Sequence, residues 1–295
     1  MITASRLGPA GDLVRLVCSI LVYGHAGAVA DNLRSIFDED ADLYDRSRPD
    51  YPPALFADLV NITGIGAGST VVEIGPGTGQ ATRGLLATGA AITAVEIGAN
   101  MARRLQTNLP DVRVVNAAFE DWTPPAAVDL VTSFTAWHWL DRKVRARLVH
   151  QVLCAGGHLA TVTTSHVRGG SVEFFDRAQE SYLRWDPATD PDERLLPPDD
   201  IPPTTDEIDT SELFGPGLRR RYVRDIDYTA DTYLDVLRTY SNHRAWPEDV
   251  RNGLLSELRS LINDDYGGVI TKTYLHELRI APALSASGGG RPPAC

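Results

Sequence analysis

Lysine is almost absent from this sequence, and acidic residues outnumber the basic ones. Only Lys143 and Lys272 occur, and 39 acidic residues against 28 basic ones give a formal net charge of −11. An acidic chain has no general attraction for phosphate backbones, so we expect no nucleic-acid partner. Nothing in the charge pattern indicates a basic membrane-binding surface either, and we expect no membrane partner.

Cysteine is scarce as well. Cys18, Cys154 and Cys295 are odd in number and far apart in the chain, a pattern that predicts neither a disulfide framework nor a metal site. Few cysteines are typical of a reducing compartment, so we expect a cytoplasmic protein. The apolar run at 16–23 is far shorter than the roughly 20 residues that a membrane-spanning helix needs.

The first thirty residues allow two interpretations. The apolar run follows Arg6 and Arg15 and precedes Ala26-Gly27-Ala28, which resembles a signal peptide. Its short apolar core and the acidic Asp12 favour the other interpretation, an N-terminal helical extension over 1–33. Such a helix would pack on the body of the protein or join two copies in a homo-oligomer.

The chain has 295 residues, of which 43% are hydrophobic and 23% charged. These values predict one large globular domain with an elaborated cap. From residue 70 the pattern alternates between strand, turn and helix, which indicates a parallel sheet covered on both faces. We expect strands at 70–74, 91–95, 112–115, 128–134 and 158–164, and helices at 80–87, 100–107 and 142–154.

The alternation stops after residue 164. Residues 165–216 are rich in Asp and Pro, and we interpret them as a cap insertion within a domain spanning 34–280. Beyond the cap we expect strands at 218–228 and 268–280 and helices at 231–240 and 247–263. Residues 281–295 form a small-residue tail that we expect to be disordered.

The sharpest local signal is Val71-Val72-Glu73-Ile74-Gly75-Pro76-Gly77-Thr78-Gly79. A β-branched strand runs into a glycine turn that opens a helix, where a ligand can approach the backbone closely. Glu96 ends the next strand, where a carboxylate can accept hydrogen bonds from ribose hydroxyls. A nicotinamide dinucleotide site is one alternative, but its fingerprint requires Gly or Ala at Gln80.

These residues resemble the class I S-adenosylmethionine-dependent methyltransferases, with the similarity running from about 37 to 280. The resemblance implies an α/β fold with a Rossmann-like, doubly wound, mostly parallel sheet of seven strands, the last antiparallel. It also implies S-adenosyl-L-methionine as the cofactor. The family's N-terminal lid is matched by Tyr44 through Pro52, and its arginine by Arg46 or, better, Arg48.

The resemblance carries over to a set of candidate cofactor-binding residues. They are Tyr44, Arg48, Glu73, Gly75, Gly77, Gly79, Glu96, Ile97, Met101, Ala118, Phe119, Glu120, Ser133 and Phe134. Ala136-Trp137-His138-Trp139 is similar to a His-Trp motif of members that methylate small molecules. The candidate acceptor-binding residues are Trp137, His138, Trp139, His166, Trp185, Tyr240 and Ser241.

His138 is the candidate catalytic base, because an imidazole can take a proton near neutral pH. It could equally only shape the pocket, and a carbon acceptor needs no base before attack. We expect methyl transfer to a small, apolar or aromatic natural-product acceptor, with C-methylation of a prenyl chain as one hypothesis. The alternatives are an NAD-dependent oxidoreductase and a family member that binds the cofactor without methylating.

Overall fold

The computed structural model describes residues 37–186 and 189–285, so the predicted extension at 1–33 and most of the tail lie outside the described residues. Within the described residues the chain divides into two compact units. Unit 1 comprises 165–202 and 225–274, and unit 2 comprises residues up to 164 together with 203–224 and those from 275 onward. The predicted cap at 165–216 is therefore shared between the two units.

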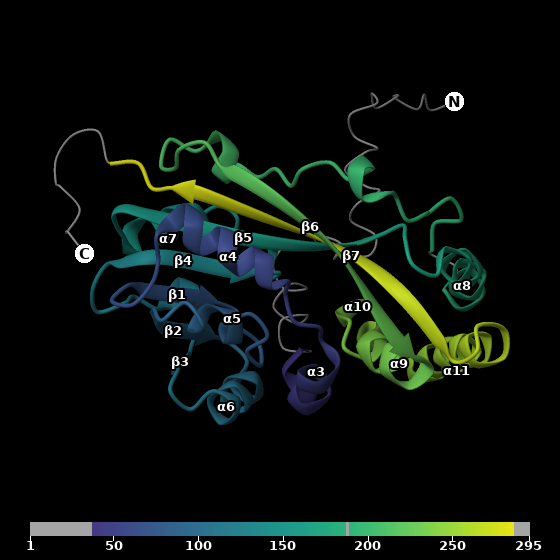
Figure 1. Ribbon diagram of the computed structural model, residues 1–295. Helices are drawn as coiled ribbons and strands as arrows, with labels where there is room; N and C mark the ends of the chain where they lie inside the picture. The colour runs from purple at the N-terminus through teal and green to yellow at the C-terminus, as the bar shows by residue number, and fades with distance from the viewer. Residues whose placement is uncertain (1–36, 187–188, 286–295) are drawn as a thin grey trace, which may run out of the picture. The chain divides into compact units, whose positions relative to one another are not determined.

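The strands form a seven-stranded sheet of order β3-β2-β1-β4-β5-β7-β6, with the last strand antiparallel (Figure 1). Their bounds are β1 Thr70–Ile74, β2 Ala91–Glu96, β3 Arg113–Asn116, β4 Val128–Phe134, β5 Leu153–Val167, β6 Leu218–Thr229 and β7 Val269–Pro282. The first five strands pair in parallel wherever they are neighbours. The predicted sheet of seven mostly parallel strands is confirmed.

The described helices follow the same alternation through β5. The α-helices are α3 Ala41–Ser47, α4 Pro53–Thr63, α5 Thr82–Leu86, α6 Ala99–Asn108, α7 Arg145–Val152, α8 Val172–Trp185, α9 Ala230–Arg238, α10 Ser241–Ala245 and α11 Glu248–Asp265. The short 3₁₀ helices are η1 Phe37–Asp40, η2 Phe119–Asp121, η3 Trp137–Trp139, η4 Pro198–Asp200 and η5 Glu207–Thr210.

The ends of α4 show how the sequence sets these elements. Pro53 occupies the first turn, where the missing N–H costs nothing, and Gly64 ends the helix with a positive φ of 73°. Leu55 and Leu59 point from this helix into the core and are fully buried.

Two elements differ from the sequence-based expectation. The helix expected at 142–154 is α7, which ends at Val152, and the strand expected at 158–164 begins already at Leu153. The register between β4 and β5 shifts between Val128 and Leu130, which lets Gly156 and Gly157 lie inside the strand. The glycine pair marks this irregularity and not a loop before the strand.

Each unit has its own apolar core. In unit 2 the two faces of the sheet are covered by separate clusters, one around Leu59 and Leu105 and the other around Val131 and Val149. In unit 1, α8, α9 and α11 bury a cluster around Phe174 that is rich in tyrosine. No helix among the described residues has the length and apolarity to cross a bilayer.

Cys154, at the start of β5, is disulfide-bonded. The other two cysteines, Cys18 and Cys295, lie outside the described residues, so the prediction that the cysteines form no disulfide framework stays a prediction.

Candidate functional site

The glycine turn lies directly after β1, at the carboxyl end of the strand. Gly75, Gly77 and Gly79 have positive φ values of 64°, 60° and 105°. A Cβ at Gly75 would lie 2.6 Å from the Cβ of Ala136, and one at Gly79 would lie 2.7 Å from Leu105. Both conformation and space therefore require glycine at the first and third positions.

Glu96, the last residue of β2, holds this turn in place. Its Oε2 accepts a hydrogen bond from the Gly77 N–H at 2.9 Å, and its Oε1 accepts one from the Gly98 N–H at 2.9 Å. A carboxylate has about four lone-pair sites, so each oxygen can accept one further donor. Burial raises the pKa of Glu96 to about 7, the backbone N–H groups oppose that rise, and the nearby Asp38 adds to it.

Glu73, inside β1, is a second buried carboxyl group beneath the turn. Its Oε2 accepts a hydrogen bond from Thr82 Oγ1 at 2.7 Å, whereas its Oε1 has no hydrogen-bond partner among the described residues. Only 1% of the residue is exposed. Burial raises the pKa of Glu73 to about 7, and the charge of Glu96 raises it further.

The arm formed by η1 and α3, residues 37–47, covers the turn from outside. The ring of Tyr44 would be 3.3 Å from a Cβ at Gly77, and the Arg48 guanidinium lies 5.1 Å from the centre of the same ring. Tyr44 and Arg48 therefore come together at the glycine turn, as the resemblance implies for the lid.

Three residues absent from the sequence-based set fasten the arm. Asp38 Oδ1 accepts hydrogen bonds from the N–H groups of Asn100 and Met101 at the start of α6. Asp45 accepts hydrogen bonds from Arg104 at 3.0 Å and from the Asn108 side chain at 2.9 Å. Asn108 also donates to the Thr78 carbonyl oxygen, which connects the arm to the turn.

The segment after β2 and β3 contains the residues that the resemblance assigns to adenine. Ile97 is 48% exposed, so its apolar side chain is accessible to a ligand. The Asn116 side chain donates to the carbonyl oxygens of Glu96 and Ile97 and so fixes this corner. Phe119 is buried, and Glu120 accepts a hydrogen bond from the Asp141 N–H at 3.3 Å.

The end of β4 meets the turn through a strained residue. Thr135 is the one non-glycine residue with positive φ in the described part of the chain, at 53°. Its hydroxyl lies 2.9 Å from the Tyr51 hydroxyl, and the Tyr51 ring packs against Phe134. Backbone strain of this kind clusters at functional sites. Ser133, two residues before Thr135, is fully buried.

The predicted acceptor motif forms η3. Trp137 is buried, with its indole N–H donating to Asp206 at 2.9 Å and its ring facing Arg145. His138 is exposed, and its ring centre lies 4.9 Å from that of Trp139. Other residues of the protein therefore cover most of the Trp137 side chain, whereas the side chains of His138 and Trp139 remain accessible to a ligand.

The other predicted acceptor residues belong to unit 1. His166 Nε2 lies 3.1 Å from the Tyr240 hydroxyl, so these two residues come together. Ser241 is buried, and the Trp185 indole N–H donates to Glu257 at 2.7 Å. His243 is also buried here; burial lowers its pKa to about 4, and the Leu237 carbonyl opposes that shift.

Comparisons with known proteins agree with this geometry. Residues 72–161 match the family described as "Methyltransferase domain". They span the glycine turn, Glu96 and the strand that precedes η3. A solved structure from Anaeromyxobacter dehalogenans, with a type II methyltransferase assignment, superposes with a TM-score of 0.57 at 24% identity. The superposition covers 79% of this chain and 97% of the Anaeromyxobacter chain.

Residues 72–161 of this chain are thus similar to a methyltransferase domain and lie on a sheet with the fold of a solved methyltransferase.

Curated relatives are similar over the same region. An uncharacterized methyltransferase of Schizosaccharomyces pombe is 28% identical over 146 residues, which are 49% of this chain and 57% of that protein. An uncharacterized methyltransferase of Mycobacterium bovis is 34% identical over 120 residues, which are 40% of this chain and 48% of that protein. The chain thus spans about half the length of the curated relatives it matches.

Proposed function

We propose that this protein binds S-adenosyl-L-methionine at the glycine turn and transfers its methyl group to a small apolar or aromatic acceptor. The observation that supports this most directly is the carboxylate of Glu96 at the end of β2, bonded to the turn through the Gly77 N–H. The resemblance to the methyltransferases implies that this carboxylate binds the cofactor ribose.

The buried polar groups fit that cofactor. Each oxygen of Glu96 is bonded to one backbone N–H and can accept one of two ribose hydroxyls. Glu73 is a second buried carboxyl group next to the turn, and its Oε1 has no hydrogen-bond partner among the described residues. A second carboxylate and an aromatic face at Tyr44 suit a cationic cofactor. Ile97 offers apolar surface to a purine.

The turn fits a nicotinamide dinucleotide less well. Gln80 occupies the position where the dinucleotide fingerprint has Gly or Ala. Its side chain is buried and donates a hydrogen bond to the Thr78 hydroxyl at 2.8 Å. A long side chain fixed inside the turn leaves less room for close backbone approach to a pyrophosphate.

When bound, S-adenosylmethionine supplies a methyl group already activated on a sulfonium. The chain then has to orient the acceptor and exclude water, and good orientation alone can contribute roughly 7–11 kcal/mol. Tyr44 and Arg48 cover the turn from the arm. His138 can take the proton of a hydroxyl or amine acceptor at its ring nitrogen; with a carbon acceptor it has no proton to take before attack.

The choice of a small aromatic or apolar acceptor rests on the composition of unit 1. Its core around Phe174 has aromatic side chains on α8, α9 and β7, and Tyr182, Trp185, Tyr240 and Trp246 pack against it. Concentrated aromatic surface with a few polar groups is typical of small-molecule sites. A natural-product acceptor, including a prenyl chain methylated on carbon, is the substrate class we favour.

The test of cofactor binding is calorimetry on Glu96→Ala, with Asp121→Ala as the matched control on an exposed carboxylate. Hydrogen bonds to a charged acceptor contribute about 1.5–3 kcal/mol, so we expect S-adenosylhomocysteine to bind Glu96→Ala at least about tenfold more weakly. The control should bind normally. Equal affinity in both variants would refute the assignment of Glu96.

Acceptor chemistry is tested with S-adenosylmethionine labelled in its methyl group and three probes: indole, phenol and geraniol. We expect a labelled product with at least one probe. His138→Ala should slow methylation of a hydroxyl while leaving cofactor affinity unchanged. Cofactor binding without any S-adenosylhomocysteine formation would instead favour a member that does not methylate.

A further inference from the structure

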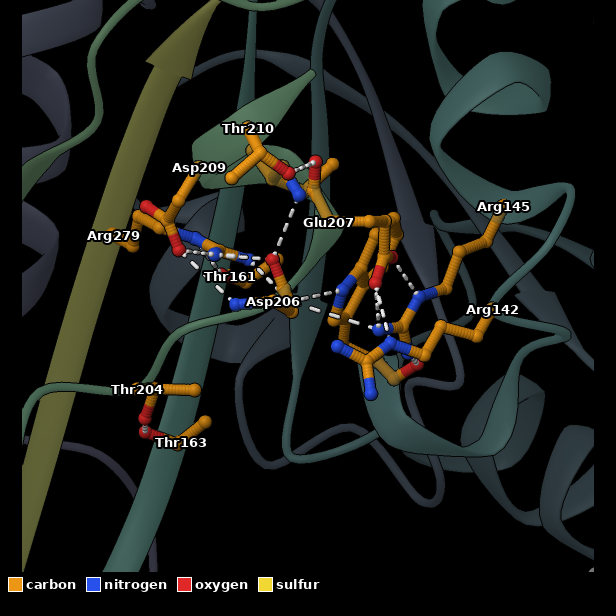
Figure 2. A network of polar contacts seen from close by, with 12 residues as sticks. Arg142, Arg145, Thr161, Thr163, Thr204, Asp206, Glu207, Asp209, Thr210 and Arg279 are labelled. Carbon is orange, nitrogen blue, oxygen red and sulfur yellow. Dashed lines mark hydrogen bonds and ion pairs between the residues drawn. The ribbon is translucent and has the colours of Figure 1, made fainter. Parts of the chain in front are cut away.

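The segment 203–210, distant in sequence from the cofactor turn, is anchored within unit 2 by a buried ionic network. Figure 2 shows Asp206, Glu207 and Asp209 facing Arg142, Arg145 and Arg279. Arg279 donates to both oxygens of Asp206, at 2.6 and 2.9 Å. Arg145 donates to both oxygens of Glu207, at 2.5 and 3.0 Å.

This network holds the indole N–H and the backbone carbonyl of Trp137, the first residue of η3. The indole N–H donates to Asp206 Oδ2 at 2.9 Å, and the backbone carbonyl accepts a hydrogen bond from Arg145 Nη1 at 2.5 Å. The Arg145 guanidinium also lies 4.6 Å from the centre of the indole ring. Trp137 therefore cannot shift without breaking a contact to this network.

The carboxylate of Asp206 is itself firmly placed. Its side chain is 8% exposed, and Arg145 lies 3.6 Å away on the side opposite its closest partners. Burial would raise the pKa of Asp206, but hydrogen bonding and charge attraction from Arg279 outweigh burial and lower it. The group is thus ionised at neutral pH and accepts the indole N–H as a charged acceptor, which strengthens the bond.

The position of Trp137 matters to the cofactor turn because of its two preceding residues. Ala136 lies so close to Gly75 that a Cβ there would be 2.6 Å from the alanine Cβ. Thr135 has the strained φ of 53° noted above, and such residues persist only where their surroundings hold them. A displacement of η3 would therefore also displace Thr135 and Ala136 and change the contact between Ala136 and Gly75.

We infer that Asp206 is a positioning residue for the cofactor site, acting through Trp137 to hold Ala136 against Gly75. The inference rests on the proposed function, because it assigns Asp206 to the same cofactor turn. If Asp206 had a purely structural role, the same groups would lie in the same positions. The affinity for the cofactor would then not depend on the indole hydrogen bond.

The experiment measures S-adenosylhomocysteine binding by calorimetry for Trp137→Phe, Asp206→Asn and the double variant. Trp137→Phe is the mild change, because it keeps an aromatic ring and removes the indole N–H. Asp209→Asn is the matched control: Asp209 lies on η5, the 3₁₀ helix that Asp206 caps, and accepts a hydrogen bond from Arg279 at 3.2 Å, but among the described residues no hydrogen bond joins it to Trp137. Circular dichroism confirms that each variant is folded.

We expect both single variants to raise the Kd for S-adenosylhomocysteine about tenfold, since displacement by about 1 Å at a site is costly. The double variant should show no further rise in Kd, because both single variants act on the cofactor site through the same indole hydrogen bond. The control should bind within about twofold of the unsubstituted protein. The indole N–H signal of Trp137, identified by its loss in Trp137→Phe, should move when S-adenosylhomocysteine is added.

Three results would overturn the inference, and they can be told apart. If the unsubstituted protein binds S-adenosylhomocysteine and folded Trp137→Phe and Asp206→Asn bind it equally well, then Asp206 is only structural. If the losses of binding affinity add up in the double variant, Trp137 and Asp206 act independently, which would also overturn the inference. If the unsubstituted protein does not bind at all, the proposed function itself fails, and the inference fails with it.

Discussion

Glu73 should make the free energy of unfolding of this protein depend on pH between about 4.5 and 7. The carboxyl group is 1% exposed, and burial raises its pKa from 4.5 to about 7. The folded state therefore holds the proton more tightly than the unfolded chain does. The contribution of Glu73 to the stability of the folded state is therefore complete below pH 4.5 and is lost as the pH rises through 7.

The magnitude follows from the shift. About 2.5 pKa units at 1.36 kcal/mol each correspond to roughly 3 kcal/mol. Glu73→Gln keeps the shape of the side chain, including the oxygen that accepts from Thr82, but cannot ionise. Relative to the unsubstituted protein, the variant should gain roughly 3 kcal/mol in free energy of unfolding between pH 4 and pH 8.

The assay is urea unfolding of both proteins at half-unit steps of pH from 4 to 8. The difference between their unfolding free energies should be constant below about pH 4.5 and should then grow with pH. Glu120→Gln, at a partly exposed carboxyl group, is the matched control. A pH-independent difference for Glu73→Gln would refute the argument that Glu73 is buried in its protonated form.

Three further predictions concern the turn, the arm and unit 1. Gly75→Ala should unfold at lower urea than Gly156→Ala: both glycines have positive φ, which costs roughly 1 kcal/mol, but only a Cβ at Gly75 meets another atom within 4 Å. Asp45→Asn should release S-adenosylhomocysteine several-fold faster in stopped flow, because the arm loses an ionised partner. Lys272→Met should gain stability over the unsubstituted protein as the pH falls from 10 to 6, because burial lowers the pKa of Lys272 to about 7. Lys143→Met, at an exposed lysine, is the matched control, and a pH-independent stability difference for Lys272→Met would contradict the burial argument.

The glycine turn and Glu96 could be predicted because their signals are local. A β-branched strand, three glycines and a carboxylate one strand later are all read directly from the sequence. Parallel strands place their carboxyl ends at one edge of the sheet, which brings distant residues such as Gly77 and Glu96 together. Their contact is confirmed by the 2.9 Å hydrogen bond between them.

The irregular start of β5 could not be predicted in the same way. Two adjacent glycines usually indicate a turn. Here the pairing of Val128 with Leu153 extends the strand back across Gly156-Gly157, and only the neighbouring strand β4 determines that register. A single sequence contains no signal for which residues of two strands are opposite each other.

The residues that fasten the site were missed because each acts across a long stretch of chain. Asp38 meets the start of α6 some 62 residues later, and Asp45 meets Arg104 at a separation of 59. Asp206 meets Trp137 across 69 residues. In the sequence these acids belong to stretches rich in Asp, which are usually solvated, so only the fold distinguishes them.

The central claim is tested most directly by titrating the purified protein, in parallel, with S-adenosylmethionine, S-adenosylhomocysteine and NAD in a calorimeter. The account predicts saturable binding of the first two compounds at one site per chain and no binding of NAD. Binding of NAD alone would contradict it, because the glycine turn and Glu96 would then hold a dinucleotide.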